Sequence, residues 1–190
     1  MKSLIVRSLV LIIGLVCLNN ILFAQSAPEK APLRIIILRH AEKPDKGYDL
    51  SCQGLNRSNA LVNVLYDKFK LPSDILVPAI KTGKKTKHAR MSQTIDPFAK
   101  KYNLHIDSKF GLGDEAGLAK YLLEKTGTIL VVWEHKNIPA IAQGLGVTGG
   151  DKKLKWKGSD FDTIWIITFK NGKAELTTDK ENINPAADCK

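Results

Sequence analysis

Two runs of consecutive large aliphatic residues, at residues 35–38 and 129–132, are the clearest hydrophobic pattern in the chain. Such runs are typical of central strands of a sheet, because these strands are covered on both faces. The second run belongs to a predicted strand over 128–133, and a weaker apolar segment predicts a short strand over 74–80. His40 follows the first run and His135 follows the second.

Helices are predicted between these strands, where apolar residues recur at three- and four-residue steps. The predicted helices are 54–69, 91–102, a shorter one around 118–122, and 139–144. Near the C-terminus, residues 164–169 and 174–176 flank Asn171-Gly172, a dipeptide that favours tight hairpin turns. Strands that alternate with helices indicate an α/β sandwich, and the hairpin makes its sheet mixed.

The N-terminal segment has the order of a secretory signal peptide. Lys2 and Arg7 precede an apolar stretch over 9–18, and small residues follow from Ala24. The apolar stretch is shorter than the roughly 20 residues of a spanning helix. We therefore expect a signal peptide over 1–24, with an uncleaved N-terminal anchor as the alternative.

After the signal peptide, the sequence predicts a flexible lead-in over 25–32 and a single domain over 33–190. Removal of residues 1–24, which contain Lys2 and Arg7 but no acidic residue, lowers the formal charge from +10 to +8. A basic surface attracts phosphorylated substrates, nucleic acids and anionic envelope surfaces alike.

The basic run over 81–88 has no interleaved aromatic residues for base stacking, so we expect no nucleic-acid partner. A rim that attracts anions to a nearby site is the functional reading that fits this run.

Two cysteines, Cys52 and Cys189, remain after the predicted cleavage. Export to an oxidising compartment would permit a disulfide between them. The sequence is equally compatible with two free thiols, because Cys189 stands next to the C-terminus, where chains are often disordered.

The two strand-end histidines suggest chemistry on phosphate. Ligands of open α/β sheets bind beyond the carboxyl ends of the strands, and a neutral imidazole is a good nucleophile toward phosphorus. Phosphoryl oxygens need fixed positive charge, which the planar fork of an arginine supplies. Arg39 stands beside His40, and Arg90 opens a predicted helix.

Four segments in this order resemble motifs of the histidine phosphatase superfamily, which includes the cofactor-dependent phosphoglycerate mutases. Residues 38–43 resemble its Arg-His-Gly motif, and residues 50–57 the stretch that opens its first helix. Residues 89–94 resemble its Arg-x-x-Gln-Thr element, and residues 131–139 the strand with its second histidine. The resemblance implies a three-layer sandwich with a mostly parallel central sheet and helices on both faces.

The same resemblance assigns roles to the site residues. It implies that His40 is the phosphorylated nucleophile, that Arg39 and Arg90 clamp the phosphoryl oxygens, and that His135 stabilises the transferred group from the opposite side. It implies neither a metal nor another cofactor. Asn137 and Arg57 are further candidate phosphate ligands; their alternatives are a helix cap for Asn137 and a structural or rim role for Arg57.

The general acid that protonates the leaving alcohol is the open question in this comparison. Family members often carry an acidic residue directly after the second histidine, where this chain has Lys136. Our candidate is Glu115, in the segment between Arg90 and His135, with Glu42 and Asp114 as alternatives. Ala41 also replaces the usual glycine of the first motif, which is a mild change unless the backbone needs a positive φ.

These observations predict a secreted or periplasmic phosphomonoester hydrolase that acts on a small phosphorylated substrate or a phosphoprotein. The alternative is an envelope protein that binds phosphate-containing ligands in the same pocket with little or no catalysis. We expect no stable membrane insertion after cleavage of the signal peptide. The physiological substrate and the oligomeric state stay open at this stage.

Overall fold

A computed structural model describes residues 31–80, 89–149 and 154–189. The predicted signal peptide over 1–24, most of the lead-in and the basic run over 81–88 lie outside the described residues, so these assignments stay predictions.

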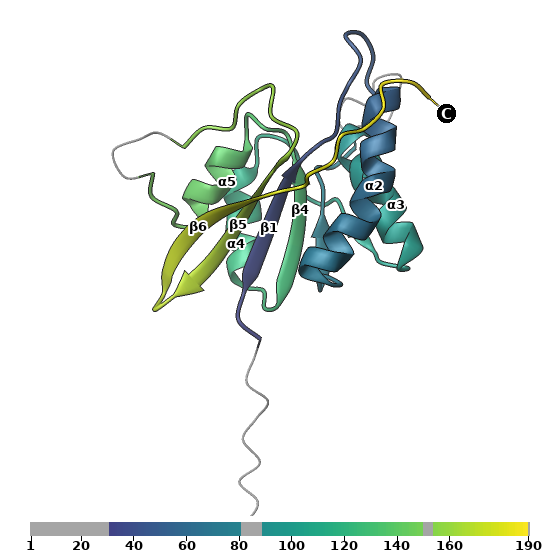
Figure 1. Ribbon diagram of the computed structural model, residues 1–190. Coiled ribbons are helices and arrows are strands. Elements are labelled where there is room, and N and C mark those ends of the chain that lie inside the picture. The colour runs from purple at the N-terminus through teal and green to yellow at the C-terminus, as the bar shows by residue number, and fades with distance from the viewer. Residues whose placement is uncertain (1–30, 81–88, 150–153, 190) are drawn as a thin grey trace, which may run out of the picture. The chain divides into compact units, whose positions relative to one another are not determined.

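A six-stranded mixed sheet forms the centre of the described part of the chain, with strand order β3-β2-β4-β1-β5-β6 (Figure 1). β1, β4, β2 and β3 run parallel, whereas β5 and β6 are antiparallel to their neighbours. The strands are β1 (Arg34–Arg39), β2 (Asp74–Leu76), β3 (Ile106–Asp107), β4 (Thr128–Trp133), β5 (Thr163–Lys170) and β6 (Lys173–Lys180).

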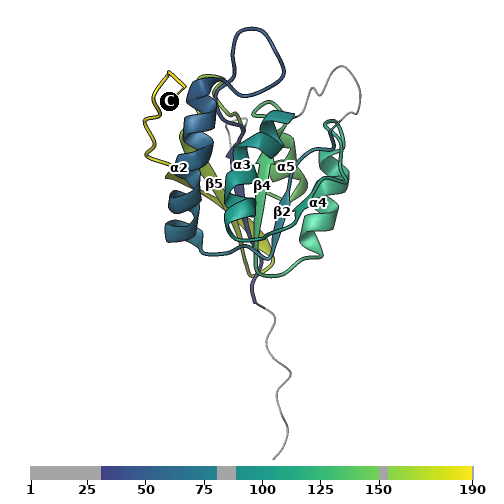
Figure 2. The ribbon, with the colours of Figure 1, turned by 90° about the vertical axis from the view of Figure 1, so that its right-hand side faces the viewer.

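Two pairs of helices cover the two faces of this sheet (Figures 1 and 2). The helices are α2 (Cys52–Phe69), α3 (Ala89–Lys101), α4 (Glu115–Leu123) and α5 (Ile138–Gly144). α2 and α3 pack on one face, and α4 and α5 pack on the other. The predicted three-layer α/β sandwich with a mostly parallel sheet is confirmed.

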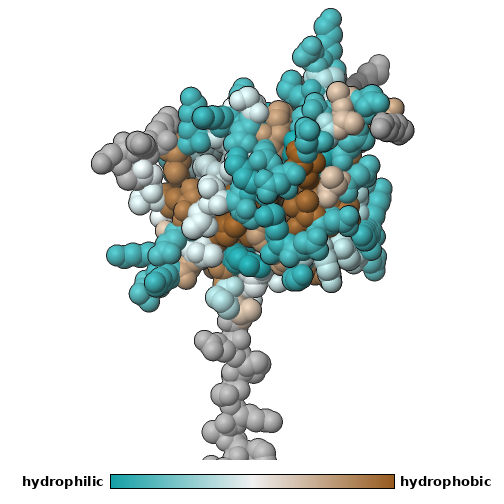
Figure 3. Space-filling model, in the orientation of Figure 1, coloured by the Kyte–Doolittle hydropathy of each residue, from teal (hydrophilic) through white to brown (hydrophobic). Residues whose placement is uncertain are grey.

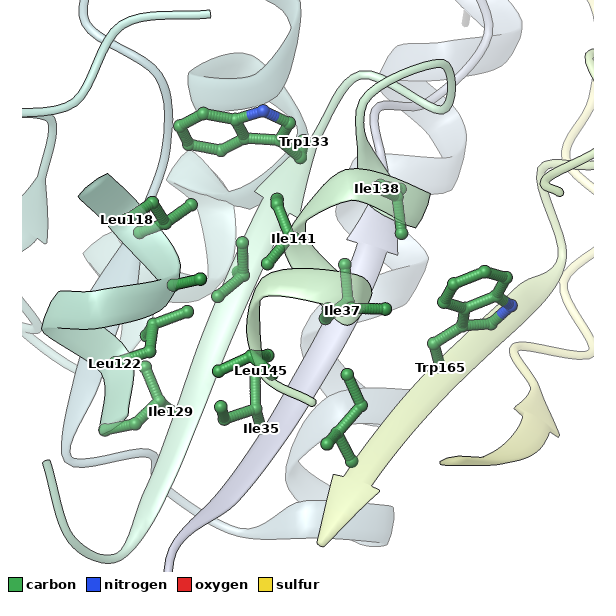
Figure 4. Packing of buried hydrophobic residues seen from close by; sticks show 14 of the residues in the cluster. Ile35, Ile37, Leu118, Leu122, Ile129, Trp133, Ile138, Ile141, Leu145 and Trp165 are labelled. Atoms are coloured by element: carbon green, nitrogen blue, oxygen red, sulfur yellow. The ribbon is translucent and has the colours of Figure 1, made fainter. Parts of the chain in front are cut away.

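The alternation of side chains along β1 explains why its aliphatic run is continuous. Ile36 and Leu38 belong to the core beneath α2 and α3, whereas Ile35 and Ile37 belong to the core beneath α4 and α5. In Figure 4 the side chains of Ile35 and Ile37 lie among those of α4 and α5. Full burial of one such side chain contributes about 1.5–3 kcal/mol, so both faces of this strand hold the domain together.

The N-terminus of α2 packs tightly against the segment that follows β1. The Ser51 hydroxyl caps the helix by accepting a hydrogen bond from the Gly54 amide at 3.2 Å, and the Ser51 amide donates to the Glu42 carbonyl at 3.0 Å. A Cβ atom on Gly54 would lie 2.2 Å from the Glu42 carbonyl oxygen, so this approach requires glycine. The contact fixes the backbone two residues beyond His40.

The predicted elements differ from the structure mainly at the edge of the sheet. The strand predicted over 74–80 is regular only over β2; beyond it, the Val77 and Ala79 amides donate to the Asp107 and Phe110 carbonyls. The two-residue strand β3 was not predicted, because so short a segment carries no periodic pattern.

The hairpin of β5 and β6 forms where it was predicted. Its turn residues Asn171 and Gly172 have positive φ angles of 51° and 74°. Both angles are those of a type I′ turn, which explains the choice of asparagine and glycine. The two strands are longer than predicted, because β6 alternates exposed and half-buried residues instead of forming an apolar run.

A disulfide joins Cys52, the first residue of α2, to Cys189 near the C-terminus, with a Cα–Cα distance of 4.8 Å. The C-terminal segment runs beside α2 (Figure 1), where the Asn56 amide donates to the Ala186 and Asp188 carbonyls at 2.9 Å. Of the two alternatives that the sequence left open, the structure has the disulfide.

The surface of the described domain is mostly hydrophilic on the face shown in Figure 3, with hydrophobic side chains visible between the polar ones. Within residues 31–80, 89–149 and 154–189, no helix has the length and apolar character needed to cross a membrane.

Candidate active site

The parallel pairing of β1 with β4 brings the two strand-end histidines together at the carboxyl ends of these strands. Arg39 lies opposite Trp133 in the parallel register, and the His40 amide donates to the Trp133 carbonyl at 3.2 Å. The residues that follow the two strands, His40 on one and Glu134 and His135 on the other, therefore lie next to one another.

His40 is buried, and its ring is held in one orientation. Nδ1 lies 2.7 Å from the Ala41 carbonyl oxygen. A carbonyl can only accept, so Nδ1 carries the proton and Nε2 keeps its lone pair. Burial, together with the smaller effect of the positive charges of Arg39 and Arg90, lowers the pKa of His40 from 6.5 to about 4. His40 is thus a neutral imidazole whose Nε2 atom keeps its lone pair.

Arg39 is almost fully buried beneath the segment that precedes β5. One guanidinium nitrogen donates to the carbonyls of Gly158 at 2.6 Å and Asp160 at 3.1 Å, and the Phe161 ring lies 3.7 Å from the guanidinium carbon. Burial lowers the pKa of Arg39 to about 10, so the side chain stays charged at neutral pH. Among the described residues, its buried Nε atom has no hydrogen-bond partner.

His135 likewise has a buried nitrogen without a partner among the described residues, its Nδ1. Burial lowers the pKa of His135, and the charge of Arg39 lowers it further. A Cβ atom on Gly158 would lie 3.6 Å from His135 Nε2, so the glycine leaves room beside the ring. An unpaired buried donor such as Arg39 Nε is costly in a folded protein.

Arg90 reaches the site from the first turn of α3. Its guanidinium donates to the carbonyls of Gly47 and Asp49, the latter at 3.3 Å. A small cavity of about 60 Å³ lies between Arg90 and His40. This cavity, called the phosphate cavity below, is lined by His40, Arg90, Met91, Leu112 and Glu134.

The Gln-Thr pair that follows Arg90 fastens α3 to the loops around His40. The Thr94 hydroxyl accepts a hydrogen bond from the Ala41 amide at 2.9 Å. Gln93 accepts from the Leu50 amide at 3.0 Å and donates to the Asp49 carboxylate at 2.8 Å. The spacing of this motif thus has a structural reason, since these side chains orient the backbone next to His40.

A larger cleft of about 550 Å³ opens on the His135 side of the site. Two exposed lysines, Lys136 and Lys155, give it positive charge, and Trp156 gives it an aromatic wall. This cleft, called the lysine cleft below, is lined by His135, Lys136, Pro139, Leu154, Lys155, Trp156 and Gly158.

Arg57, a candidate phosphate ligand, is occupied by two carboxylates instead. Its guanidinium binds Glu42 at 2.8 Å and Glu181 at 2.6 Å, and all its nitrogens donate to these two groups. Burial alone would lower the pKa of Arg57, but the two carboxylates outweigh it and raise the pKa. Arg57 does not line the phosphate cavity, which matches its alternative, structural role.

Glu115 and Asn137, two further candidates, bind each other. The Glu115 Oε1 atom accepts hydrogen bonds from Asn137 Nδ2 at 2.8 Å, Trp133 Nε1 at 3.1 Å and the Gly113 amide at 3.0 Å. Asn137 is the residue before α5, but its side chain makes no capping hydrogen bond. Neither residue lines the phosphate cavity.

Glu134 is the residue that reasoning from the sequence missed. It lines the phosphate cavity together with His40 and Arg90, although it was not among the candidates for the general acid. Strand alternation could have indicated it: residues 132 and 134 share one side of β4, as residues 38 and 40 share one side of β1.

Among the described residues, no cluster of three or more histidine, cysteine, aspartate or glutamate side chains has the arrangement of a metal site.

Comparisons with known proteins identify the class of fold. No protein-family model matches the sequence, and no curated protein matches it. Solved structures do match, and they belong to the histidine phosphatase superfamily. The chain therefore has the histidine phosphatase, or phosphoglycerate mutase-like, fold, as the four sequence motifs predicted.

Three of these structures are close in extent to the described domain. The protein histidine phosphatase SixA, complexed with tungstate, superposes with a TM-score of 0.57 at 16% identity, covering 78% of this chain and 97% of SixA. A phosphoserine phosphatase from Entamoeba histolytica in complex with phosphoserine superposes with a TM-score of 0.54 at 14% sequence identity. The match covers 79% of this chain and 97% of the phosphoserine phosphatase. The alpha-ribazole phosphatase from Shigella flexneri superposes with a TM-score of 0.54 at 12% sequence identity. The match covers 76% of this chain and 95% of the alpha-ribazole phosphatase.

Proposed function

We propose that the protein is an exported phosphomonoester hydrolase that works through a phosphohistidine on His40. The observation that carries this proposal is the orientation of His40 at the phosphate cavity. Its Nδ1 proton is held by the Ala41 carbonyl, its Nε2 lone pair is free, and Arg90 lines the same cavity. Such a geometry suits nucleophilic attack on a bound phosphoryl group.

The reaction has two steps. In the first, His40 Nε2 forms a bond to phosphorus while the bond from phosphorus to the ester oxygen breaks, and the alcohol leaves with a proton. In the second, water attacks phosphorus, the bond to His40 breaks, and inorganic phosphate leaves. Arg90, which lines the phosphate cavity, stabilises the phosphoryl oxygens in both transition states. The family resemblance gives Arg39 and His135 the same role, although neither of them lines this cavity.

The lysine cleft supports a substrate whose leaving group is larger than the phosphate cavity. It lies on the His135 side of the site and offers two lysines and an indole. Similar structures were solved with phosphoserine in one case and tungstate, an oxoanion, in another. The substrate is thus a small phosphorylated compound or a phosphoprotein.

The disulfide between Cys52 and Cys189 supports export. Disulfides persist in oxidising compartments such as the periplasm and the extracellular space, and they are rare in the cytosol. Together with the predicted signal peptide over 1–24, the disulfide favours a secreted or periplasmic location.

A second candidate is an envelope protein that binds phosphate-containing ligands without turning them over. The engagement of Glu115 by Trp133 and Asn137 favours it, because this carboxylate was the sequence-based candidate for the general acid. Both proposals use the same cavity, and they differ in whether a phosphohistidine forms.

Hydrolysis of 4-nitrophenyl phosphate by the domain over 25–190 tests the proposal. We expect His40→Ala to lower kcat/KM at least about 10³-fold, because the covalent route disappears. His105→Ala is the matched control, since His105 is exposed and lies away from the site. Quenching during turnover with detergent at alkaline pH, at which phosphohistidine is stable, should trap phosphate on His40.

Full activity of His40→Ala would contradict the mechanism. A wild-type protein that binds inorganic phosphate but releases no nitrophenol at any pH between about 4 and 8 would favour the binding protein instead.

A further inference from the structure

We propose that Glu134 is the proton donor of the first step and the base that activates water in the second. This inference rests on the proposed phosphohydrolase function and adds a catalytic residue to it. It is carried by the position of Glu134, by the contacts of the other carboxylates near the site and by the charges that surround Glu134.

The register of the central strands places Glu134 beside the nucleophile. Because Arg39 pairs with Trp133, the next residues along the two parallel strands, His40 and Glu134, are at the same level. Both line the phosphate cavity. A carboxyl at this position is within reach of the ester oxygen and of an attacking water.

The other candidate carboxylates are held by structural contacts. Glu42 makes a bidentate ion pair with Arg57. Glu115 accepts hydrogen bonds from Trp133, Asn137 and Gly113. Asp114 caps α4 by accepting from the Gly117 amide at 3.1 Å. None of them lines the phosphate cavity.

Glu134 differs from these residues because its carboxylate makes no hydrogen bond or ion pair with any described residue, although it is half-buried. Its charge acts on two site residues, since it raises the pKa of Arg39 and of His135 against the effect of their burial. A free carboxyl among cationic groups in a site for an anion is unfavourable for binding alone. A role in proton transfer explains why the site has a carboxyl group at Glu134.

The proposed steps balance. In the first step His40 Nε2 forms a bond to phosphorus while the bond from phosphorus to the ester oxygen breaks. The protonated Glu134 gives its proton to that oxygen as it leaves. In the second step the Glu134 carboxylate takes a proton from water as the water oxygen bonds to phosphorus and the bond to His40 breaks. Glu134 is then protonated again, ready for the next turnover.

The test compares Glu134→Gln with the wild type on two substrates that differ in leaving group. Phenyl phosphate has a basic leaving group that needs a proton, whereas 4-nitrophenyl phosphate does not. We expect kcat/KM for phenyl phosphate to fall about 10²- to 10⁴-fold and kcat/KM for 4-nitrophenyl phosphate to fall less than about 10-fold. With the second substrate, the variant should show a burst of nitrophenol, because hydrolysis of its phosphohistidine is slow.

Glu115→Gln is the comparison variant, since it makes the same change at the carboxylate that the sequence favoured. A selective loss on phenyl phosphate in Glu115→Gln and not in Glu134→Gln would overturn the assignment. Equal losses on both substrates in Glu134→Gln, without a burst, would also overturn it.

Failure of the underlying function gives a different result. A wild-type protein that hydrolyses neither substrate overturns both proposals, whereas a wild type that hydrolyses both and a Glu134→Gln that matches it overturn only the role of Glu134. If Glu134→Gln does not fold, Glu134→Asp replaces it. That variant keeps a carboxyl group that can donate a proton. Its kcat/KM for phenyl phosphate should be lower than that of the wild type but still measurable, and it should fall more than its kcat/KM for 4-nitrophenyl phosphate.

Discussion

His40 combines burial with a fixed tautomer, and both have a measurable consequence. Burial lowers its pKa to about 4. Because a lowered pKa favours the neutral form, the imidazole stays unprotonated down to about pH 5, where an unperturbed histidine would be mostly charged.

We predict that nitrogen-15 NMR of the histidine side chains will find His40 neutral and protonated on Nδ1 at pH 5.5. The hydrogen bond from Nδ1 to the Ala41 carbonyl and the low pKa are the reasons. His40→Ala assigns the signal by removing it. A midpoint near 6.5, or a ring protonated on Nε2, would mean that the nucleophile is not prepared in the way the structure indicates.

The sequence predicted the chemistry of individual residues better than their partners. The sequence left Arg57 as either a phosphate ligand or a structural residue, and in the structure its guanidinium binds Glu42 and Glu181. Glu181 lies 124 residues away along the chain. No local pattern contains such a contact, so the choice between an anion-binding and a structural arginine required the tertiary structure.

At the scale of elements, the cluster of Arg57, Glu42 and Glu181 joins three parts of the chain. Arg57 lies on α2, Glu42 follows β1 and Glu181 follows β6. Arg57 and Glu181 are both buried. Burial raises the pKa of Glu181 to about 8, although Arg57 opposes this shift. At neutral pH the Glu181 carboxyl is therefore largely protonated, and Arg57 is its hydrogen-bond donor and the counter-charge of Glu42.

We predict that Arg57→Ala lowers the free energy of unfolding by about 3–5 kcal/mol, because it leaves the Glu42 carboxylate without its counter-charge and the buried Glu181 carboxyl without its hydrogen-bond donor. Urea unfolding followed by circular dichroism measures the loss. The triple variant Arg57→Met, Glu42→Gln and Glu181→Gln should recover most of it, since no charge then remains unpaired. A loss below about 1 kcal/mol in the single variant would show that the cluster is not what holds these elements together.

Strands with strong apolar runs were predicted closely, and weak ones were not. β4 occupies 128–133 as predicted, and β1 is one residue longer at each end than its aliphatic run. β2 ends earlier and β3 was missed, because pairing at the edge of the sheet defines them more than their own sequence does. Hydrophobic pattern thus predicts the centre of this sheet and says little about its margin.

At the scale of the whole molecule, the Cys52–Cys189 disulfide closes a loop over 137 residues. The sequence left this pairing open because it depends on the path of the C-terminal segment, which is fixed by contacts such as that of Asn56 with Ala186. The long loop means that the bond removes much conformational freedom from the unfolded chain.

We predict that reduction of this bond lowers the stability of the protein by about 2–5 kcal/mol, which for a domain of this size corresponds to a fall in Tm of roughly 5–15 °C. Differential scanning calorimetry with and without dithiothreitol measures the difference. The double variant Cys52→Ser and Cys189→Ser should melt at the lower temperature in both conditions. A Tm of the wild type that does not respond to reductant would indicate that the bond is absent or adds no stability.

The same bond changes how the chain would break. Because it joins the start of α2 to the C-terminal segment, residues 52–189 form a closed covalent ring. One proteolytic cut anywhere inside this ring opens it without releasing a fragment, so His40, which precedes the ring, stays attached to Arg90 and His135, which lie within it. After a first cut the protein would therefore remain one molecule, and it would fall into two pieces only when the disulfide is reduced.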